Sequence, residues 1–172
     1  RAMDEFPNLK MLRSFTTRAA RDSDLPGEYE VVSEQAWKQR LLAGEYAWNQ
    51  DYAGFLYGTR RDDVKEALES ADPYLAAIIP SRIPSIHDLT HSFGLDRRLL
   101  SVFIFAPSPG ILRHRMKERG EKPESIEARL LACENWNAEA RNERRYKRFI
   151  TDRNDLDEKY ALLKRYIDSF IR

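Results

Sequence analysis

The chain has 172 residues, of which 42% are apolar and 33% charged, and its formal net charge is +1. This length and composition indicate one folded domain with a sizeable core, and the charge gives no global argument for nucleic-acid binding. Cys133 is the only cysteine, so no disulfide can form within the chain, which favours a reducing compartment. No signal-like start and no run of about eighteen apolar residues is present. We therefore expect a cytoplasmic protein without a membrane segment.

The first part of the chain is predicted to be rich in strands. Residues 1–6 favour the end of a helix, so we expect further chain before them. A helix is expected from Ser33, which is a good N-cap, to Gly44. The pair Thr59 and Asp62 resembles a capping box and predicts a helix through Leu68. Strands are expected at residues 11–17, 29–32, 45–49 and 54–57.

Strands and helices alternate in the rest of the chain, which is typical of a mainly parallel α/β sheet. The nearly continuous apolar run at 99–106 suits a strand covered on both faces. Further strands are expected at 74–79 and 148–151, and helices at 109–119, at 123–145 and from Asp155 onward. The strand-rich interval before residue 60 is therefore interpreted as an insert on an α/β core.

Arg18 and Arg21 follow a predicted strand that carries the hydroxyls of Ser14, Thr16 and Thr17. Two arginines three residues apart, beside hydroxyls, can converge on one phosphate because the guanidinium fork matches phosphate oxygens. Ordinary surface arginines are the alternative that this segment alone leaves open.

A second segment, Gly-Phe-Leu-Tyr-Gly-Thr at residues 54–59, places Tyr57 between two glycines. Glycines permit tight turns and close approach, so the Tyr57 hydroxyl and Thr59 are candidates for ligand contact. A hairpin followed by a capped helix is the alternative.

Together and in order, these segments resemble the guanylate kinase family. The residues that carry the resemblance in the first part are Ser14, Thr16, Thr17, Arg18, Arg21, Tyr29, Val32, Ser33, Glu45, Tyr46, Tyr57, Gly58 and Thr59. Those in the second part are the segments 102–108, 112–120, 125–130 and 154–156. The resemblance covers nearly the whole chain.

The resemblance implies a fold and a division of the chain. The fold would be α/β, with a three-layer, P-loop-kinase-like parallel sheet core, a β-rich acceptor-binding insert and a helical lid. The insert would span residues 13–59 and the lid residues 115–146. The core would comprise residues 60–112 and 147–172, within a single domain of 172 residues.

The resemblance also implies roles for particular side chains. The acceptor's phosphate would be held by Arg18, Arg21, Tyr29 and Tyr57, and its base would contact Ser14 and Thr59. The arginines that stabilise the transferring phosphoryl group would be Arg115, Arg119 and Arg129. ATP and Mg²⁺ are implied as cofactors, but no residue of this chain is assigned as a metal ligand. These roles are consistent with phosphoryl transfer, in which positioning and charge stabilisation dominate.

Three departures from the family pattern stand out. No Gly-x-x-Gly-x-Gly-Lys-Ser/Thr loop is present, so the chain lacks the backbone cradle and lysine that hold ATP phosphates. Trp48 occupies the place of the guanine-binding glutamate; it cannot accept a hydrogen bond and would stack or fill space. The acidic strand end of the family is replaced by a segment that ends in Arg82, which would meet a carboxylate or second phosphate, or face solvent.

These observations leave two functions open. The first is ATP-dependent phosphoryl transfer to a nucleoside monophosphate, with GMP the family default, or to a related phosphorylated metabolite such as ribose 1,5-bisphosphate. The second is a catalytically inactive module that binds a phosphorylated peptide or partner. Nucleic-acid binding by the basic segment 135–148 is disfavoured because acidic residues interrupt it. The sequence gives no indication of the oligomeric state.

Overall fold

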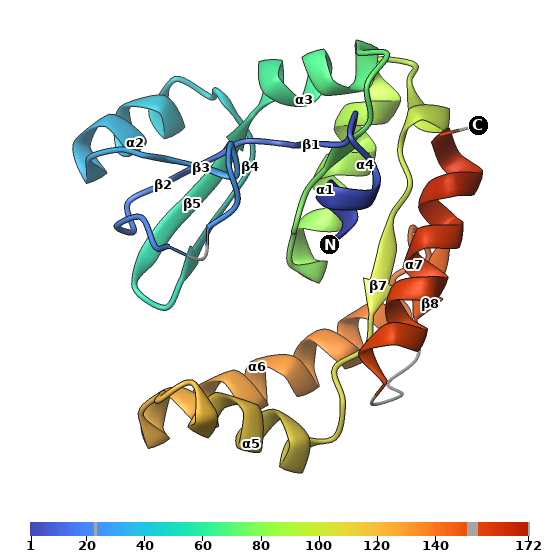
Figure 1. The fold of residues 1–172 in the computed structure, drawn as a ribbon. Coiled ribbons are helices and arrows are strands. Elements are labelled where there is room, and N and C mark those ends of the chain that lie inside the picture. Colours follow the sequence, from blue (N-terminus) through green and yellow to red (C-terminus); the bar gives the residue numbers. More distant parts are fainter. Residues whose placement is uncertain (23, 151–154, 172) are drawn as a thin grey trace. The chain divides into compact units, whose positions relative to one another are not determined.

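The structure is a computed structural model that describes residues 1–22, 24–150 and 155–171 (Figure 1). The chain forms two compact units. The first unit comprises residues 1–78 and 82–99, and the second comprises residues 79–81 and 100–172, apart from the positions outside the described ranges. Each unit combines helices with small sheets, so the expectation of a mixed helix-and-strand fold is confirmed.

A four-stranded sheet is the main feature of the first unit, with the strand order β3-β2-β5-β4. The strands are β2 (Ser14–Thr16), β3 (Tyr29–Val31), β4 (Tyr46–Tyr52) and β5 (Phe55–Arg60). The β2–β3 pair is parallel, and β5 is antiparallel to both β2 and β4. Ala53 and Gly54 join β4 to β5, both with positive φ (53° and 78°), as a two-residue hairpin turn requires.

A register shift near the start of β4 decides which side chains face which side of this sheet. Tyr46 lies opposite Arg60, whereas Trp48 lies opposite Thr59, so the strand contains a β-bulge. Two residues that are two positions apart normally share a face, but the extra residue in a bulge turns them to opposite faces. As a result Tyr46 packs with Phe15 and Trp37, while Trp48 packs in a different cluster.

Helices cover both faces of the sheet. On one face lies α2 (Glu34–Leu42), whose N-cap Ser33 accepts a hydrogen bond from the Ala36 N–H at 3.2 Å, as expected. The other face is covered by α3 (Arg61–Glu69) and by α4 (Ile83–Ser92), a helix that was not expected from the sequence. The predicted capping box is wrong: Thr59 lies within β5, and the N-cap of α3 is Arg60, which makes no side-chain cap.

The strand predicted at residues 11–17 is divided into two strands of different sheets. β1 (Lys10–Met11) pairs in parallel with β6 (Tyr74–Leu75), while β2 belongs to the four-stranded sheet. Arg13 lies at the break and forms ion pairs with Glu30 at 3.1 Å and Asp63 at 3.2 Å. The first unit also contains two short helical turns, α1 (Ala2–Glu5) and η2 (Asp96–Arg98), while a third, η1 (Pro80–Arg82), has its first two residues in the second unit.

The second unit contains β7 (Val102–Ile104) and β8 (Arg148–Ile150) in parallel register. It also contains α5 (Pro109–Glu118), the long α6 (Pro123–Asn142), which contacts α5, and α7 (Leu156–Ile171), which packs on β8. Asp155 caps α7, since its Oδ1 accepts from the Asp157 N–H at 2.8 Å. The predicted end of the last strand, Thr151, lies outside the described residues. In the described part of the chain, β1–β6 and β7–β8 form two separate two-stranded parallel sheets, and the third parallel pair, β2–β3, belongs to the four-stranded sheet.

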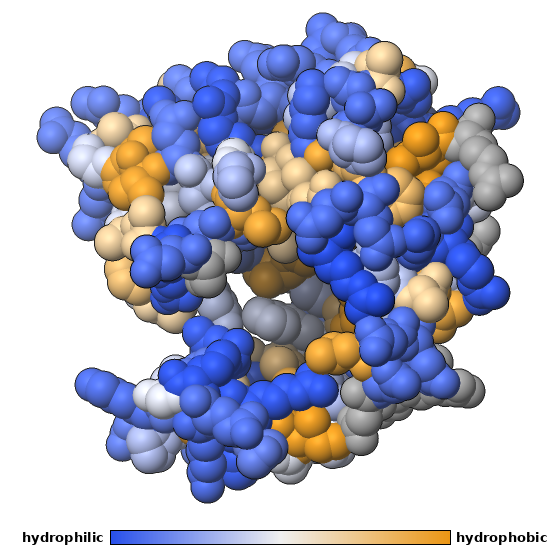
Figure 2. All heavy atoms as spheres, viewed as in Figure 1, coloured by the Kyte–Doolittle hydropathy of each residue, from blue (hydrophilic) through white to orange (hydrophobic). Residues whose placement is uncertain are grey.

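The face of the molecule in Figure 2 is mostly hydrophilic, with apolar side chains in separate small areas. None of the helices that the structure describes is long and apolar enough to cross a membrane.

Candidate phosphate-binding site

Four side chains form a row across the four-stranded sheet of the first unit. The strand register places Trp48 opposite Thr59, and Ser14 opposite Tyr29. Ser14 and Thr59 lie on neighbouring strands, and their hydroxyl oxygens are 2.8 Å apart, a hydrogen bond in which either group can be the donor. The row Trp48–Thr59–Ser14–Tyr29 therefore lies on one face of the sheet, because residues opposite each other on paired strands share a face.

Arg18, Tyr29 and Tyr57 come together on this face. The rings of Tyr29 and Tyr57 meet edge to face with centroids 6.0 Å apart, and the Arg18 guanidinium lies 4.9 Å from the centre of the Tyr29 ring. Arg18 is buried, with only 6% of its surface exposed. Burial raises the pKa of Tyr29 to about 12, with a further contribution from Glu28, so its hydroxyl remains a hydrogen-bond donor at neutral pH.

An acidic residue that the sequence analysis missed joins the two arginines of this site. Asp24 Oδ1 accepts from Arg18 Nη2 at 2.8 Å, and Asp24 Oδ2 accepts from the backbone N–H of Arg21 at 2.9 Å. Arg18 Nη1 also donates to the Ala19 carbonyl at 2.8 Å. The hydrogen bond from Arg18 lowers the pKa of Asp24, and the Arg21 N–H lowers it further. The bond to Asp24 raises the pKa of Arg18 against the effect of burial, and Tyr57 adds to the rise.

The side chain of Arg21 itself is exposed. Its charge adds to the lowering of the Asp24 pKa, so it lies close enough to act on the same carboxylate. The structure thus brings Arg18, Tyr29 and Tyr57 into contact and places Arg21 at their margin.

The other end of the row contains the residues predicted to contact a base. Ser14 and Thr59 are buried and bond to each other. Trp48 is 4% exposed and packs with a cluster of apolar side chains from α3 and α4, namely Val64, Leu68, Ile86 and Leu89. Of the two roles considered for Trp48, the structure therefore favours filling space over stacking on a ligand. Its Nε1 has no hydrogen-bond partner among the described residues.

Arg82 lies at the end of η1, where α4 begins. Its side chain is half-buried, and its Nε has no hydrogen-bond partner in the described part of the chain. The Nε of Arg82 is therefore buried and does not face solvent.

The three arginines predicted to act on the transferring group lie in the second unit. Arg119 Nη2 is 2.8 Å from Glu121 Oε1, and Arg129 Nε is 3.3 Å from Glu121 Oε2. Glu121, which the sequence analysis did not single out, thus gathers guanidinium groups from the end of α5 and from α6. Arg115 is half-buried and forms no ion pair with the described residues. Arg113 and Glu127 form a further ion pair between α5 and α6.

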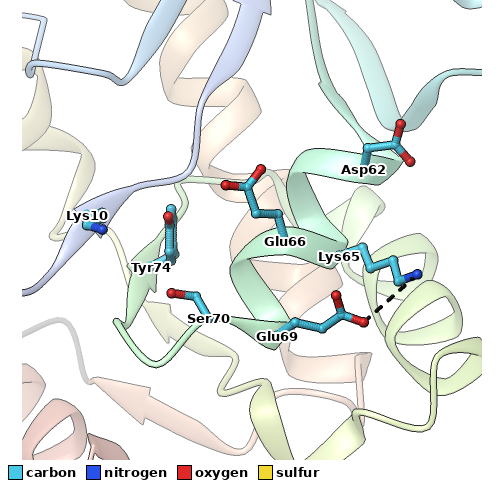
Figure 3. A pocket seen from close by; sticks show the side chains of 7 residues that line it. All are labelled: Lys10, Asp62, Lys65, Glu66, Glu69, Ser70 and Tyr74. Atoms are coloured by element: carbon cyan, nitrogen blue, oxygen red, sulfur yellow. Dashed lines mark ion pairs between the residues drawn. The ribbon is translucent and has the colours of Figure 1, made fainter.

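A separate shallow pocket lies beside α3, β1 and β6 (Figure 3). Its lining is charged and includes an ion pair between Lys65 and Glu69 at 3.9 Å, and Lys10 pairs with Asp72 at 2.7 Å. The full lining is Lys10, Asp62, Lys65, Glu66, Glu69, Ser70 and Tyr74. None of the predicted site residues belongs to it, so the pocket and the predicted site are different places.

The described residues contain no group of three or more His, Cys, Asp or Glu side chains that would hold a metal ion. The printed sequence also has no glycine-rich loop that ends in Lys-Ser or Lys-Thr. A loop of that kind is what cradles the phosphates of ATP, so no residue of this chain is assigned to holding them.

The fold and site define a mixed α/β protein with a sheet face lined by arginine and tyrosine side chains. A family model described as guanylate kinase matches residues 4–170. The chain is 31% identical to the guanylate kinase of Nitratidesulfovibrio vulgaris over 165 residues, which covers 95% of this chain and 75% of that protein. It is 30% identical to the guanylate kinase of Symbiobacterium thermophilum over 135 residues, which covers 77% of this chain but only 61% of that protein.

A crystal structure of guanylate kinase from Anaplasma phagocytophilum matches this structure with a TM-score of 0.71 and 21% identity. The match covers 98% of this chain and 79% of that chain, and it supports the fold. This chain belongs to the guanylate kinase family.

Proposed function

We propose that the protein containing this chain transfers a phosphoryl group from ATP to a nucleoside monophosphate, GMP by family default, or to a related phosphorylated metabolite. The contact between Arg18, Tyr29 and Tyr57 on one face of a sheet carries this proposal. A guanidinium and two tyrosine hydroxyls offer several donors to one phosphate group. Such a site positions the acceptor, which is the main demand that phosphoryl transfer makes on a protein.

We also propose the division of labour that the family suggests. Residues 13–59 form the acceptor-binding insert, residues 60–112 and 147–172 form a three-layer, P-loop-kinase-like core, and residues 115–146 form the lid. Arg115, Arg119 and Arg129 stabilise the transferring group; support comes from Glu121, which contacts two of these three arginines. ATP with Mg²⁺ would supply the phosphoryl group. We assign no residue of this chain to binding ATP or Mg²⁺.

The acceptor's base is the part of the substrate for which this chain departs most from its family. Guanine presents N–H donors, which a carboxylate accepts, whereas Trp48 is buried against α3 and α4 and offers only a donor. The paired hydroxyls of Ser14 and Thr59 remain on that side of the site. We propose that discrimination in favour of guanine is weak, because the buried polar partner that would reject other bases is missing.

The test is a coupled assay of ADP release by the full-length protein with a panel of acceptors that includes GMP, AMP and ribose 1,5-bisphosphate. We expect turnover with at least one acceptor, and a rise in its KM when Arg18 is replaced by Ala. No turnover with any acceptor would eliminate the kinase proposal.

The burial of Trp48 also favours a second candidate, a module that binds a phosphorylated peptide and performs no transfer. In that case the chain would bind a phosphoserine peptide in calorimetry, Arg18→Ala would abolish the binding, and GMP would not compete. Competition by GMP at micromolar concentration would argue against this candidate.

A further inference from the structure

Three arginine side chains gather around one buried ring on the α2 side of the four-stranded sheet. The ring belongs to Phe15, which is 1% exposed and packs with the cluster that includes Trp37 of α2. The guanidinium carbons of Arg13, Arg40 and Arg60 lie 5.3, 4.2 and 5.2 Å from the centre of that ring. Because all three distances are measured to the same point, the three positive charges lie close together. Like charges at such short range repel, so a stable cluster needs negative charge among them.

The protein supplies acids to two of these arginines. Asp63 Oδ1 accepts from Arg13 Nη2 at 3.2 Å and from Arg60 Nη2 at 2.7 Å, and Asp63 Oδ2 accepts from Arg60 Nε at 2.9 Å. Glu30 forms a second ion pair with Arg13 at 3.1 Å. The bond to Asp63 raises the pKa of Arg60 against the effect of burial, and Glu45 adds to the rise. Arg13 and Arg60 are therefore compensated by acids of the chain.

Arg40 has no such acid. It forms no ion pair with the described residues, and its Nη1 is buried without a hydrogen-bond partner among them. An arginine on a helix surface pairs with acids three or four residues away, but Ala36, Trp37, Ala43 and Gly44 occupy those positions here. An unpaired buried donor of a charged group is costly. The cluster is thus one negative charge short at Arg40.

The Tyr46 hydroxyl lies beside this guanidinium. Burial raises the pKa of Tyr46 and the charge of Arg40 opposes the rise, so the two side chains are close to each other. Tyr46 Oη is buried and has no hydrogen-bond partner in the described part of the chain. The side chains of Arg13 and Arg60 are 44% and 32% exposed, so an ion from solution can reach the cluster from their side.

We propose that Arg13, Arg40 and Arg60 form a second anion-binding site, which takes a phosphate-sized oxyanion with at least two free oxygens. The planar guanidinium fork presents paired N–H groups that match such oxygens. A phosphate group carries more than one negative charge at neutral pH, so it can compensate Arg40 and still accept hydrogen bonds from the two partly exposed arginines.

This site lies on the other face of the sheet from the proposed acceptor site. Phe15 follows Ser14 in β2, and neighbouring residues of a strand point to opposite faces. Ser14 belongs to the row that ends at Tyr29, whereas Phe15 and Tyr46 pack under α2. The inference therefore goes beyond the proposed function and does not depend on it.

The experiment follows the arginine Nε–H signals of the isotope-labelled chain by NMR while inorganic phosphate is added. The Arg40 signal is assigned by its absence from Arg40→Gln. We expect this signal to shift saturably in the original chain. In Arg40→Gln, the Kd measured from the signals of Arg13 and Arg60 should be at least about tenfold higher, which corresponds to about 1.4 kcal/mol. Methyl phosphate is titrated in parallel, since the same group occurs as a free ion and as a phosphomonoester; binding of either supports the site, and the tighter ligand identifies the source.

Arg61→Gln is the matched control. It removes the same side chain and charge from the position next to Arg60, but Arg61 is exposed and forms no ion pair with the described residues. Its Kd for phosphate should equal that of the original chain. GMP affinity in calorimetry should be the same in Arg40→Gln as in the original chain, because the two sites lie on opposite faces.

Ala36→Glu is a second variant, and it keeps all three arginines. It places a carboxylate four residues before Arg40 on α2, the order in which an acid and a base on a helix stabilise each other best. The new carboxylate should replace the external anion, so the melting temperature should rise and the Kd for phosphate should increase several-fold.

The outcomes separate this inference from the proposed function. An Arg40 signal that does not shift at about 20 mM phosphate would overturn the site, since it would require a Kd far above the millimolar range. An equal rise in Kd for Arg40→Gln and Arg61→Gln would also overturn it, because binding would then reflect general positive charge. Both results leave the acceptor site untouched. Conversely, Arg18→Ala should abolish GMP binding and leave the shift of the Arg40 signal intact.

Discussion

Gly58 lies between two predicted ligand-contacting residues, Tyr57 and Thr59, and the structure gives a packing reason for the glycine. A Cβ at this position would lie 2.8 Å from Cδ1 and 2.9 Å from Cε1 of the Tyr46 ring. Tyr46 is buried and stacks on Trp37 with ring centroids 5.0 Å apart, so its ring has little room to move. Gly58→Ala should therefore destabilise the first unit by overpacking.

The magnitude follows from two opposing effects. Forcing an extra carbon into a packed core costs roughly 1–3 kcal/mol. Replacing glycine by alanine reduces the entropy of the unfolded chain and returns roughly 0.4–1 kcal/mol. The net loss of unfolding free energy is thus expected to be about 1.3 kcal/mol, taking the midpoints of both ranges.

The assay is urea-induced unfolding followed by tryptophan fluorescence, since Trp37 reports directly on the ring stack around Tyr46. Gly110→Ala is the matched control: Gly110 is in α5, where an added Cβ meets nothing within 4 Å, so this change should leave stability equal or slightly higher. In a Tyr46→Leu background the cost of Gly58→Ala should shrink. An undiminished cost in that background, or no cost at all, would refute the packing explanation.

Three further predictions concern buried polar groups and the altered pocket. Burial raises the pKa of Asp63, but hydrogen bonds from Arg60 and Arg13 outweigh it and hold the pKa below its ordinary value. This stabilisation is present above the unfolded pKa of about 3.9 and is lost as the pH falls through the lower folded value. Urea unfolding between about pH 6 and pH 3 should therefore show a smaller acid-induced loss of stability for Asp63→Asn than for the original chain; equal losses would contradict the assignment. Trp48→Glu, which restores the family residue, should lower the melting temperature and should not improve GMP affinity in calorimetry. The reason is that the bulge directs this side chain into apolar surroundings. A stable variant with tighter GMP binding would show that reasoning to be wrong. Ser14→Ala should cost about 1–3 kcal/mol in chemical unfolding, because it leaves the buried Thr59 hydroxyl unpaired, and adding Thr59→Val should recover part of the loss; no recovery would contradict the pairing.

Local sequence signals predicted a good part of the fold. Ser33 and Asp155 cap their helices as expected, because an N-cap bonds to backbone groups only two or three residues away. The strand predicted at residues 11–17 is divided because its first part pairs with β6 and its second with β3 and β5, strands that lie far along the chain. The capping box at Thr59 failed for a similar reason: pairing with β4 extends β5 through that residue.

In the candidate site, too, the sequence predicted residues with local signals and missed residues whose contacts form only in the folded chain. Arg18 and Tyr57 were candidates from their residue types and surroundings, and Tyr29 was added by the resemblance to the family; the structure brings all three into contact, although their roles stay a prediction. Asp24 was missed. Its position only a few residues from two arginines was a sequence signal for an ion pair. Glu121 was missed as well, since its role depends on guanidinium groups arriving from two helices.

The sequence by itself determined the family of this chain and the arginine and tyrosine side chains proposed to bind phosphate, because the order and spacing of the residues that carry the family resemblance are local properties. The tertiary structure decided what surrounds them. The bulge in β4 directs Trp48 into the cluster with α3 and α4, and the folded connection between β2 and β3 sets Asp24 against Arg18. Both outcomes depend on strand register and on packing between distant segments, which no local pattern of residues specifies.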